Sequence, residues 1–317
     1  MNRKWMTAAL AAVLLAGCTG TQPAQENTET NEEPTETAAV SAEGLKILTP
    51  QQAPALSLLP VIVEGKNTVD YAINGAEDLK AAFISPNPEY DVIIAPTNLG
   101  VQLAAAGKTG YKLLGIVDWG NLYIVGNEEA DLEGDGTGIA YFGQDSVPGL
   151  VFAKAFPQLT ANAKVFNSAS EAQADLMAGH VNAALLAEPL ATATVGKSEG
   201  KLKILANVQE AWGGEGFPMA AMFVKGDTYE ANKAMYDSML SVMKEYAESV
   251  NPDDPSKLIE DINAAGLENL GLPSAEVVAK CYNRMNVKIA KAADAKQAVA
   301  DFMAVWNVTD IDAAFAE

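Results

Sequence analysis

The chain is poor in the residues that most catalytic and metal sites require. Its 317 residues include one histidine and two cysteines, and 21 Lys and Arg stand against 41 Asp and Glu. A single histidine excludes a multi-histidine metal site, and no C-x-x-C or H-E-x-x-H spacing exists. There is no P-loop and no G-x-S-x-G elbow, although residue counts alone do not exclude a Ser-His-Asp arrangement. The sequence therefore holds no recognisable catalytic motif, and we expect neither an enzyme nor a cofactor.

The first residues are expected to direct export. Arg3 and Lys4 precede an apolar run, 5–16, that is too short to span a bilayer, so 1–17 is predicted to be a secretory signal peptide. This segment runs into Leu-Ala-Gly-Cys, which resembles the bacterial lipobox. The match implies cleavage before Cys18 and lipid attachment to its sulfur, which would anchor the protein to a membrane. We expect an extracytoplasmic, lipid-anchored protein, in a cell with one membrane or two.

Residues 18–44 predict a disordered acidic tether behind that cysteine. They hold six glutamates and no base, so apolar burial cannot offset the entropy of ordering, and like charges extend the chain. The signal peptide contributes +2 and the tether −6 to a formal charge of −20, which leaves −16 for 45–317. An acidic body repels phosphate backbones, so we expect no nucleic-acid partner.

Two isolated residues with reactive side chains are expected to be structural. Once Cys18 carries lipid, Cys281 has no disulfide partner, and we interpret it as a small apolar residue in helix packing. His180 follows Gly179 at the end of a predicted helix, where it would interact with the helix dipole.

From residue 45 the chain alternates β-rich runs with helical segments. This alternation predicts βαβ units and mainly parallel sheets covered on both faces, an α/β fold. After Lys225 the pattern predicts helices alone. The predicted strands are 45–48, 68–73, 91–95, 111–117, 122–125, 139–142, 164–166, 183–186, 202–208 and 220–224. The predicted helices between them are 56–64, 77–84, 99–106, 147–156, 170–178 and 189–195.

The glycine-rich run 134–138 is interpreted as a turn or hinge. As a calcium loop from Asp131 it would need a glutamate where Phe142 stands, and as a dinucleotide loop it would need a glycine at Ile139.

The loops that follow predicted strands are the candidate binding site, because ligands of open α/β sheets bind beyond the carboxyl ends of strands. The loops 49–54, 95–98, 118–121, 143–148, 187–189 and 212–218 contain amides, hydroxyls, Gly, Pro and Trp but no Lys or Arg. Meeting at one cleft, they would form a small-molecule pocket. The candidate ligand-binding residues are Thr49, Gln51, Gln52, Pro54, Thr97, Asn98, Trp119, Gln144, Asp145, Ser146, Glu188 and Trp212.

These motifs, in this order, resemble a known family over about residues 45–250. They are Thr49-Pro50 with Pro54, YDVIIAPT at 90–97, YFGQDSVPG at 141–149 and NAALLAEP at 182–189. The chain resembles substrate-binding lipoproteins of ABC transporters with the type II periplasmic-binding fold, in the nitrate, taurine, sulfonate and thiamine-precursor group.

The resemblance implies two lobes joined by a two-stranded hinge that closes on a ligand. On this chain it implies a first lobe of 45–134 plus 225–317 and a second lobe of 135–224. Hinge candidates are Gly126, the run 134–138 and Lys225-Gly226. It also implies that the loop from Thr49 to Pro54 lines the cleft, with its prolines lowering the cost of ordering on binding. The implied partners of this expected monomer are a small-molecule ligand and an ABC permease with its ATPase.

The ligand class is left between two alternatives. Helix N-termini alone can hold an anion such as a sulfonate or nitrate. Yet the loops carry Asp118, Asp145, Glu188 and Glu215 and no base, which favours a neutral or cationic guest. Tryptophans in these loops would stack on an aromatic ring or a cation. We therefore place an aminopyrimidine of the thiamine-precursor kind ahead of a sulfonate.

Two other functions remain as alternatives. An enzyme on the same fold is one, since menaquinone-pathway enzymes and pyrimidine synthases resemble this architecture. A sensory or adhesive surface lipoprotein without a transporter is the other.

Overall fold

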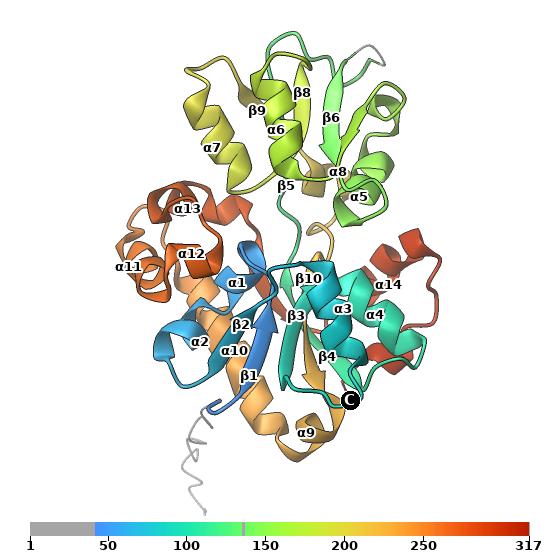
Figure 1. The fold of residues 1–317 in the computed structure, drawn as a ribbon, viewed down its shortest axis with the longest axis vertical. Coiled ribbons are helices and arrows are strands. Elements are labelled where there is room, and N and C mark those ends of the chain that lie inside the picture. Colours follow the sequence, from blue (N-terminus) through green and yellow to red (C-terminus); the bar gives the residue numbers. More distant parts are fainter. Residues whose placement is uncertain (1–41, 135–136, 317) are drawn as a thin grey trace, which may run out of the picture. The chain divides into compact units, whose positions relative to one another are not determined.

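Two β-sheets, each covered by helices, organise the residues that the computed structural model describes, which are 42–134 and 137–316 (Figure 1). The predicted signal peptide, Cys18 and nearly all of the predicted tether lie outside the described residues. Within the described ranges, no helix is long and apolar enough to cross a membrane.

The first sheet has six strands in the order β11-β4-β10-β3-β1-β2. β3 and β4 are almost wholly buried, as their near-continuous apolar runs predict. β1 pairs in parallel with β2 and β3, whereas β10 runs antiparallel to β3 and β4, and β11 antiparallel to β4. The strands are β1 (Lys46–Thr49), β2 (Thr68–Tyr71), β3 (Val92–Pro96), β4 (Tyr111–Asp118), β10 (Ala220–Lys225) and β11 (Val287–Lys291).

The second sheet has five strands in the order β7-β6-β8-β5-β9. β6 pairs in parallel with β7 and β8, and β5 runs antiparallel to β8 and β9. The strands are β5 (Leu122–Gly126), β6 (Ile139–Phe142), β7 (Lys164–Phe166), β8 (Ala183–Ala187) and β9 (Lys203–Asn207).

The helices are divided between the two sheets. We call each sheet with its helices a lobe. The second lobe carries α5 (Val147–Ala155), α6 (Ala169–Met177), α7 (Leu190–Lys197), α8 (Val208–Trp212) and the short η1 (Pro157–Leu159). The first lobe carries α1 (Ala53–Ser57), α2 (Leu59–Glu64), α3 (Ala76–Ile84), α4 (Thr97–Ala105), α9 (Gly226–Ala231), α10 (Lys233–Ser249), α11 (Ser256–Ala265), α12 (Leu267–Leu270), α13 (Ala275–Cys281), α14 (Lys296–Met303), η2 (Tyr282–Arg284), η3 (Ala304–Trp306) and η4 (Asp312–Ala314).

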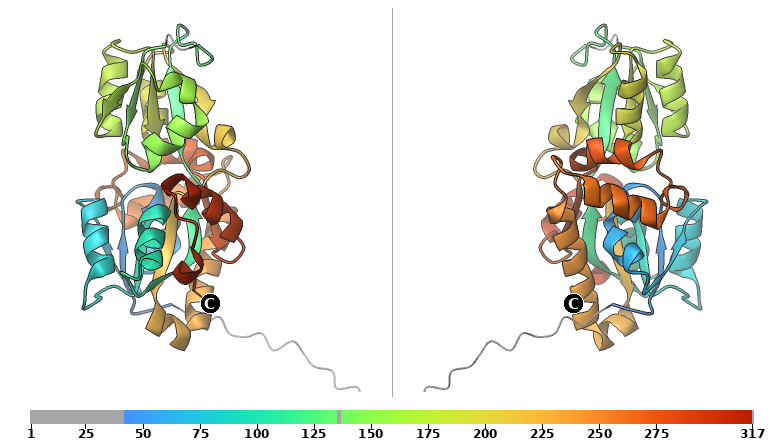
Figure 2. Two further views of the ribbon diagram at one scale, coloured as in Figure 1. Left: turned by 90° about the vertical axis from the view of Figure 1, so that its right-hand side faces the viewer. Right: turned by 90° about the vertical axis from the view of Figure 1, so that its left-hand side faces the viewer.

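The C-terminal helices flank the first sheet on two sides. In Figure 1, α11, α12 and α13 (orange) lie on one side and α14 (red) on the other; in Figure 2 the red helix faces the viewer in the left view and the orange helices in the right view. α11 packs against α2, and α14 packs against α4. The expectation of helices alone after Lys225 was wrong, because β11 returns to the edge of the first sheet beside β4.

Sheet membership also changes the expected lobe boundaries. β5 lies in the second sheet although 122–126 was assigned to the first lobe, and β10 lies in the first sheet although 220–224 was assigned to the second. Both sheets are mixed rather than mainly parallel, because β5 and β10 run antiparallel to their neighbours.

The chain therefore crosses between the sheets at 119–121 and at 213–219, not at the predicted hinge residues. The two crossing segments are hydrogen-bonded to each other, with the Phe217 N–H donating to the Trp119 carbonyl and the Met219 N–H to the Asp118 carbonyl. Gly120 has a φ of 90°, in the region that favours glycine. The predicted hinge residue Gly126 lies instead inside β5, where a Cβ would lie 2.6 Å from the Asn182 carbonyl oxygen.

Candidate ligand-binding cavity

A cavity of about 440 Å³ lies where the loops after β1, β3, β4, β6 and β8 come together. Both lobes line it, and its volume suits a small organic molecule. Thirteen of its nineteen lining residues are apolar, mostly alanine and proline, and six are polar. The polar residues are Gln51, Gln52, Asn98, Asp118, Asn121 and Ser146.

The loop after β1 is held by main-chain and side-chain contacts to the α12 region. The side-chain amide of Gln51 donates to the carbonyls of Glu268 and Asn269 at 3.0 and 3.1 Å. The Gln52 N–H donates to the Leu270 carbonyl. Gln52 has a φ of 67°, a conformation that costs a residue with a side chain about 1–3 kcal/mol. Among the described residues its amide has no hydrogen-bond partner, so it remains available to a ligand.

Asp118 is the single charged residue of the lining. It is the last residue of β4 and is 1% exposed. One carboxylate oxygen accepts a hydrogen bond of 2.8 Å from the Gly120 N–H, and within the described residues no base reaches the other. Burial raises the pKa of this carboxyl from 3.8 to about 7. The carboxyl is therefore protonated below about pH 7, and its ionised form has no positively charged partner among the described residues.

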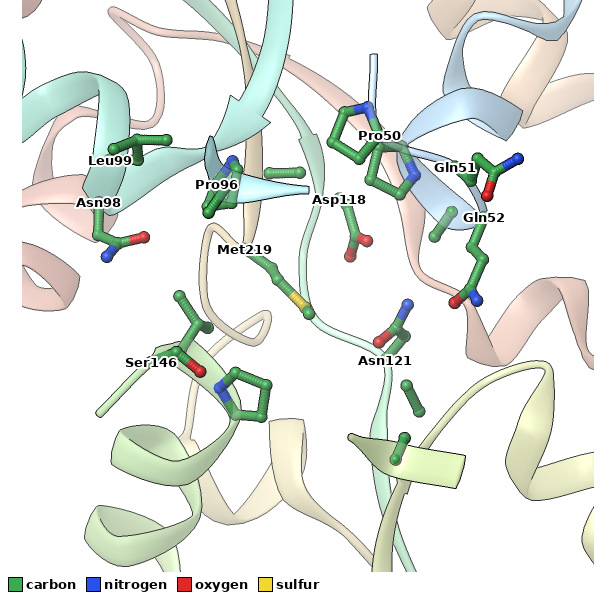
Figure 3. A pocket seen from close by; sticks show the side chains of 18 of the residues that line it. Pro50, Gln51, Gln52, Pro96, Asn98, Leu99, Asp118, Asn121, Ser146 and Met219 are labelled. Carbon is green, nitrogen blue, oxygen red and sulfur yellow. The ribbon is translucent and has the colours of Figure 1, made fainter. Parts of the chain in front are cut away.

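Two asparagines add further acceptors around the same space. Asn121, which is 4% exposed, begins the second lobe, and Asn98 lies in the first turn of α4. In the described part of the chain, neither side-chain oxygen has a hydrogen-bond partner. Figure 3 shows Asp118, Asn121 and Gln52 on one side of the cavity and Asn98 and Ser146 on the other.

Ser146 brings the β6–α5 loop into the lining. Its hydroxyl donates to the Gly143 carbonyl at 3.0 Å and so closes the turn before α5. Gly149 allows this turn to approach the helix, since a Cβ there would lie 2.4 Å from the Gly143 carbonyl oxygen. The neighbouring candidates Gln144 and Asp145 are exposed and are not among the lining residues.

Of the twelve predicted residues, the structure brings Gln51, Gln52, Pro54, Asn98 and Ser146 together at the cavity. Two others stand just behind it. Thr49 is buried at the end of β1, and its hydroxyl donates to the Pro50 carbonyl. Thr97 is buried at the start of α4, where its hydroxyl has no partner among the described residues.

Glu188 is absent from the lining because it makes an ion pair between the lobes. It is 0% exposed, and the Arg284 Nε donates to its carboxylate at 2.8 Å. The Thr192 hydroxyl donates to the same carboxylate and accepts from Arg284 Nη2. The Tyr123 hydroxyl donates to the Arg284 carbonyl, which adds a second contact between the lobes, from β5 to η2.

The two predicted tryptophans line a different cavity, of about 840 Å³. The Trp119 indole N–H donates to the Lys288 carbonyl, so the ring packs against the first lobe. The Lys154 ammonium lies 3.9 Å from the centroid of the Trp212 ring, which occupies that face with a cation–π contact. Neither ring is therefore placed to stack on a guest of the first cavity.

Asp118 and Asn121 are the polar lining residues that the candidate set lacked. Both belong to the loop 118–121, which was predicted to face the cleft, but Trp119 was selected from it. Consecutive residues of an extended strand point to opposite faces, and an acidic residue ending the apolar run of β4 was the available signal. No cluster of His, Cys, Asp and Glu that could hold a metal ion occurs among the described residues.

No protein-family model and no curated protein matches the sequence. Solved structures do match. An ABC transporter protein from Parabacteroides distasonis is 20% identical, with a TM-score of 0.67 over 86% of this chain and 95% of that chain. The periplasmic aliphatic sulphonate-binding protein of Escherichia coli is 16% identical, with a TM-score of 0.63 over 86% and 92%. The periplasmic nitrate-binding protein of Synechocystis PCC 6803 is 12% identical, with a TM-score of 0.51 over 75% and 69%.

The chain therefore has the two-lobed α/β fold of periplasmic substrate-binding proteins of ABC transporters. The predicted fold class and the resemblance to the sulfonate and nitrate group are confirmed at the level of the fold.

Proposed function

We propose that the protein is an extracytoplasmic solute-binding lipoprotein that captures a small molecule between its lobes and delivers it to an ABC importer. The observation that carries this proposal is the cavity at the carboxyl ends of strands from both sheets, beside two paired crossing segments. Such segments allow the lobes to close on a solute. Export and anchoring through Cys18 rest on the sequence alone. For the ligand, an aminopyrimidine is favoured over a sulfonate, taurine or nitrate.

The chemistry of the cavity supports binding rather than turnover. Its lining contains no histidine, cysteine or lysine. The hydroxyl of Ser146 donates to a main-chain carbonyl, not to a base. Cys281 lies outside the cavity, at the end of α13 in the core, and burial raises the pKa of its thiol to about 12, which suppresses the nucleophilic thiolate. His180 is exposed beyond α6, where it pairs with Asp175.

The direct test is native mass spectrometry of the full-length protein purified from its own cells. We expect a small molecule to travel with the folded protein in a one-to-one complex and to be recovered unchanged after unfolding. Deletion of the gene should reduce uptake of that molecule by the cells. Conversion of the molecule by the purified protein would favour an enzyme instead. Binding without any effect on uptake would favour a sensory or adhesive protein.

A further inference from the structure

The cavity contains hydrogen-bond acceptors that have no donor among the described residues. The free oxygen of Asp118, the side-chain oxygen of Asn121 and the side-chain oxygen of Asn98 all lack partners among the described residues. Asp118 and Asn121 are more than nine-tenths buried, and both line the cavity. A buried acceptor without a partner costs free energy unless a ligand or a bound water satisfies it.

The charge of the lining residues also favours a ligand that donates hydrogen bonds and carries positive charge. Asp118 is its only ionisable residue, and no lysine or arginine among the lining residues compensates it. The surrounding alanine, proline and methionine side chains cannot solvate a carboxylate. A cation entering the cavity would supply the missing counter-charge, whereas an anion would bring a second negative charge against the first.

The N-terminus of α5, one of the helices that begin at the cavity, has used most of its main-chain donors. At the start of α5, the N–H groups of Ser146 and Gly149 both donate to the Gly143 carbonyl. Pro148, between them, has no N–H. The first turn of this nine-residue helix therefore offers little of the N–H cluster on which anion binding at helix N-termini depends.

We propose that the ligand is a small organic cation whose N–H groups donate to Asp118 and Asn121, with its apolar body against the alanine and proline walls. This inference rests on the proposed solute-binding function, and it makes Asp118 the residue that determines specificity. Amidinium, guanidinium and protonated aminopyrimidine groups have the required chemistry. Sulfonates and nitrate do not.

The test compares matched probes on the full-length protein and two variants. Benzamidine carries a planar cationic amidinium, and benzamide is its neutral counterpart of nearly equal shape. Agmatine and a protonated aminopyrimidine extend the cation set, and taurine, ethanesulfonate and nitrate form the opposing set. The variants are Asp118→Asn, which keeps the shape but removes the charge, and Asp145→Asn, which removes an exposed carboxylate outside the lining.

We expect at least one cation to bind the native protein, with benzamidine binding more tightly than benzamide. Asp118→Asn should weaken cation binding about tenfold or more, since hydrogen bonds to charged groups contribute about 1.5–3 kcal/mol. Asp145→Asn should leave the affinity unchanged. Dissociation constants come from isothermal titration, and melting curves of each variant without probe show that it is folded.

Three results would overturn the proposal. They are binding of a sulfonate or nitrate with no cation bound, equal cation affinity in the native protein and Asp118→Asn, and no binding of any cation in the set. An anionic guest found by native mass spectrometry would refute the cation assignment and leave the solute-binding function standing. Chemical conversion of the guest would refute the solute-binding function itself.

Discussion

The buried carboxylate of Asp118 should make the ligand-free protein less stable as the pH rises. Its pKa is raised by burial from 3.8 to about 7 in the folded state. Between these values the unfolded chain has released a proton that the folded chain still holds. The unfolded state thus binds fewer protons, and the free energy of unfolding falls with increasing pH. Above about pH 7 both states are ionised and the effect is constant.

The size of this loss of stability follows from the pH range between the two pKa values. About three pH units at about 1.4 kcal/mol per unit give a penalty of about 4 kcal/mol at pH 8 relative to pH 4. Asp118→Asn removes the titration but retains a side-chain oxygen that can accept from Gly120. The free energy of unfolding of this variant minus that of the native protein should therefore increase steadily from about pH 4 to pH 7 and then level off.

The assay is urea unfolding of both proteins, freed of guest, at half-unit steps from pH 4 to pH 8.5. Asp145→Asn is the matched control, because an exposed carboxyl is solvated in the folded and the unfolded chain alike. The free energy of unfolding of this control minus that of the native protein should not rise between pH 4 and pH 7. A stability difference between Asp118→Asn and the native protein that does not vary with pH would refute the reasoning, since it would mean that water reaches the carboxylate.

Three further substitutions, two of them with a matched control, test the residues around the cavity. Gln52→Gly should raise the free energy of unfolding by about 1 kcal/mol, because glycine accepts the φ of 67° without strain, while weakening ligand binding in titrations. Arg284→Met should lower it by about 3 kcal/mol in urea unfolding, since a buried carboxylate loses its partner. Lys288→Met, which breaks an exposed ion pair, should change it by less than about 1 kcal/mol. Gly149→Ala should cost about 1–3 kcal/mol in the same assay, because its Cβ meets main-chain atoms. Gly196→Ala, in a helix with open space, should add about 0.5 kcal/mol.

The sequence was sufficient to predict that certain loops meet, because the carboxyl ends of neighbouring strands lie at one edge of a sheet. It was not sufficient to predict which side chain of a loop faces inward. Side chains alternate in direction at the end of β4, so Asp118 points into the cavity. The indole N–H of the adjacent Trp119 donates to the Lys288 carbonyl instead. Aromatic character was a weaker guide than position in the strand.

Contacts between residues far apart in the sequence account for the other differences between prediction and structure. Glu188 was interpreted as a ligand contact, but its partner Arg284 is 96 residues away in the chain and belongs to a helical turn that local periodicity does not place. Separation in the sequence also hides β11, whose short run of alternating burial pairs with β4 although five α-helices stand between it and β10 in the chain. Local patterns determine elements, whereas tertiary contacts decide which faces those elements use.

The cavity contains two features that weaken the ligand-free fold, the strained backbone of Gln52 and the uncompensated charge of Asp118. Neither is needed to complete the core, since both side chains project into the cavity (Figure 3). A ligand that supplies N–H donors and positive charge would offset the cost of the Asp118 charge when it binds, so binding would stabilise the folded protein more than its contact area alone would. An anion would add to that cost instead.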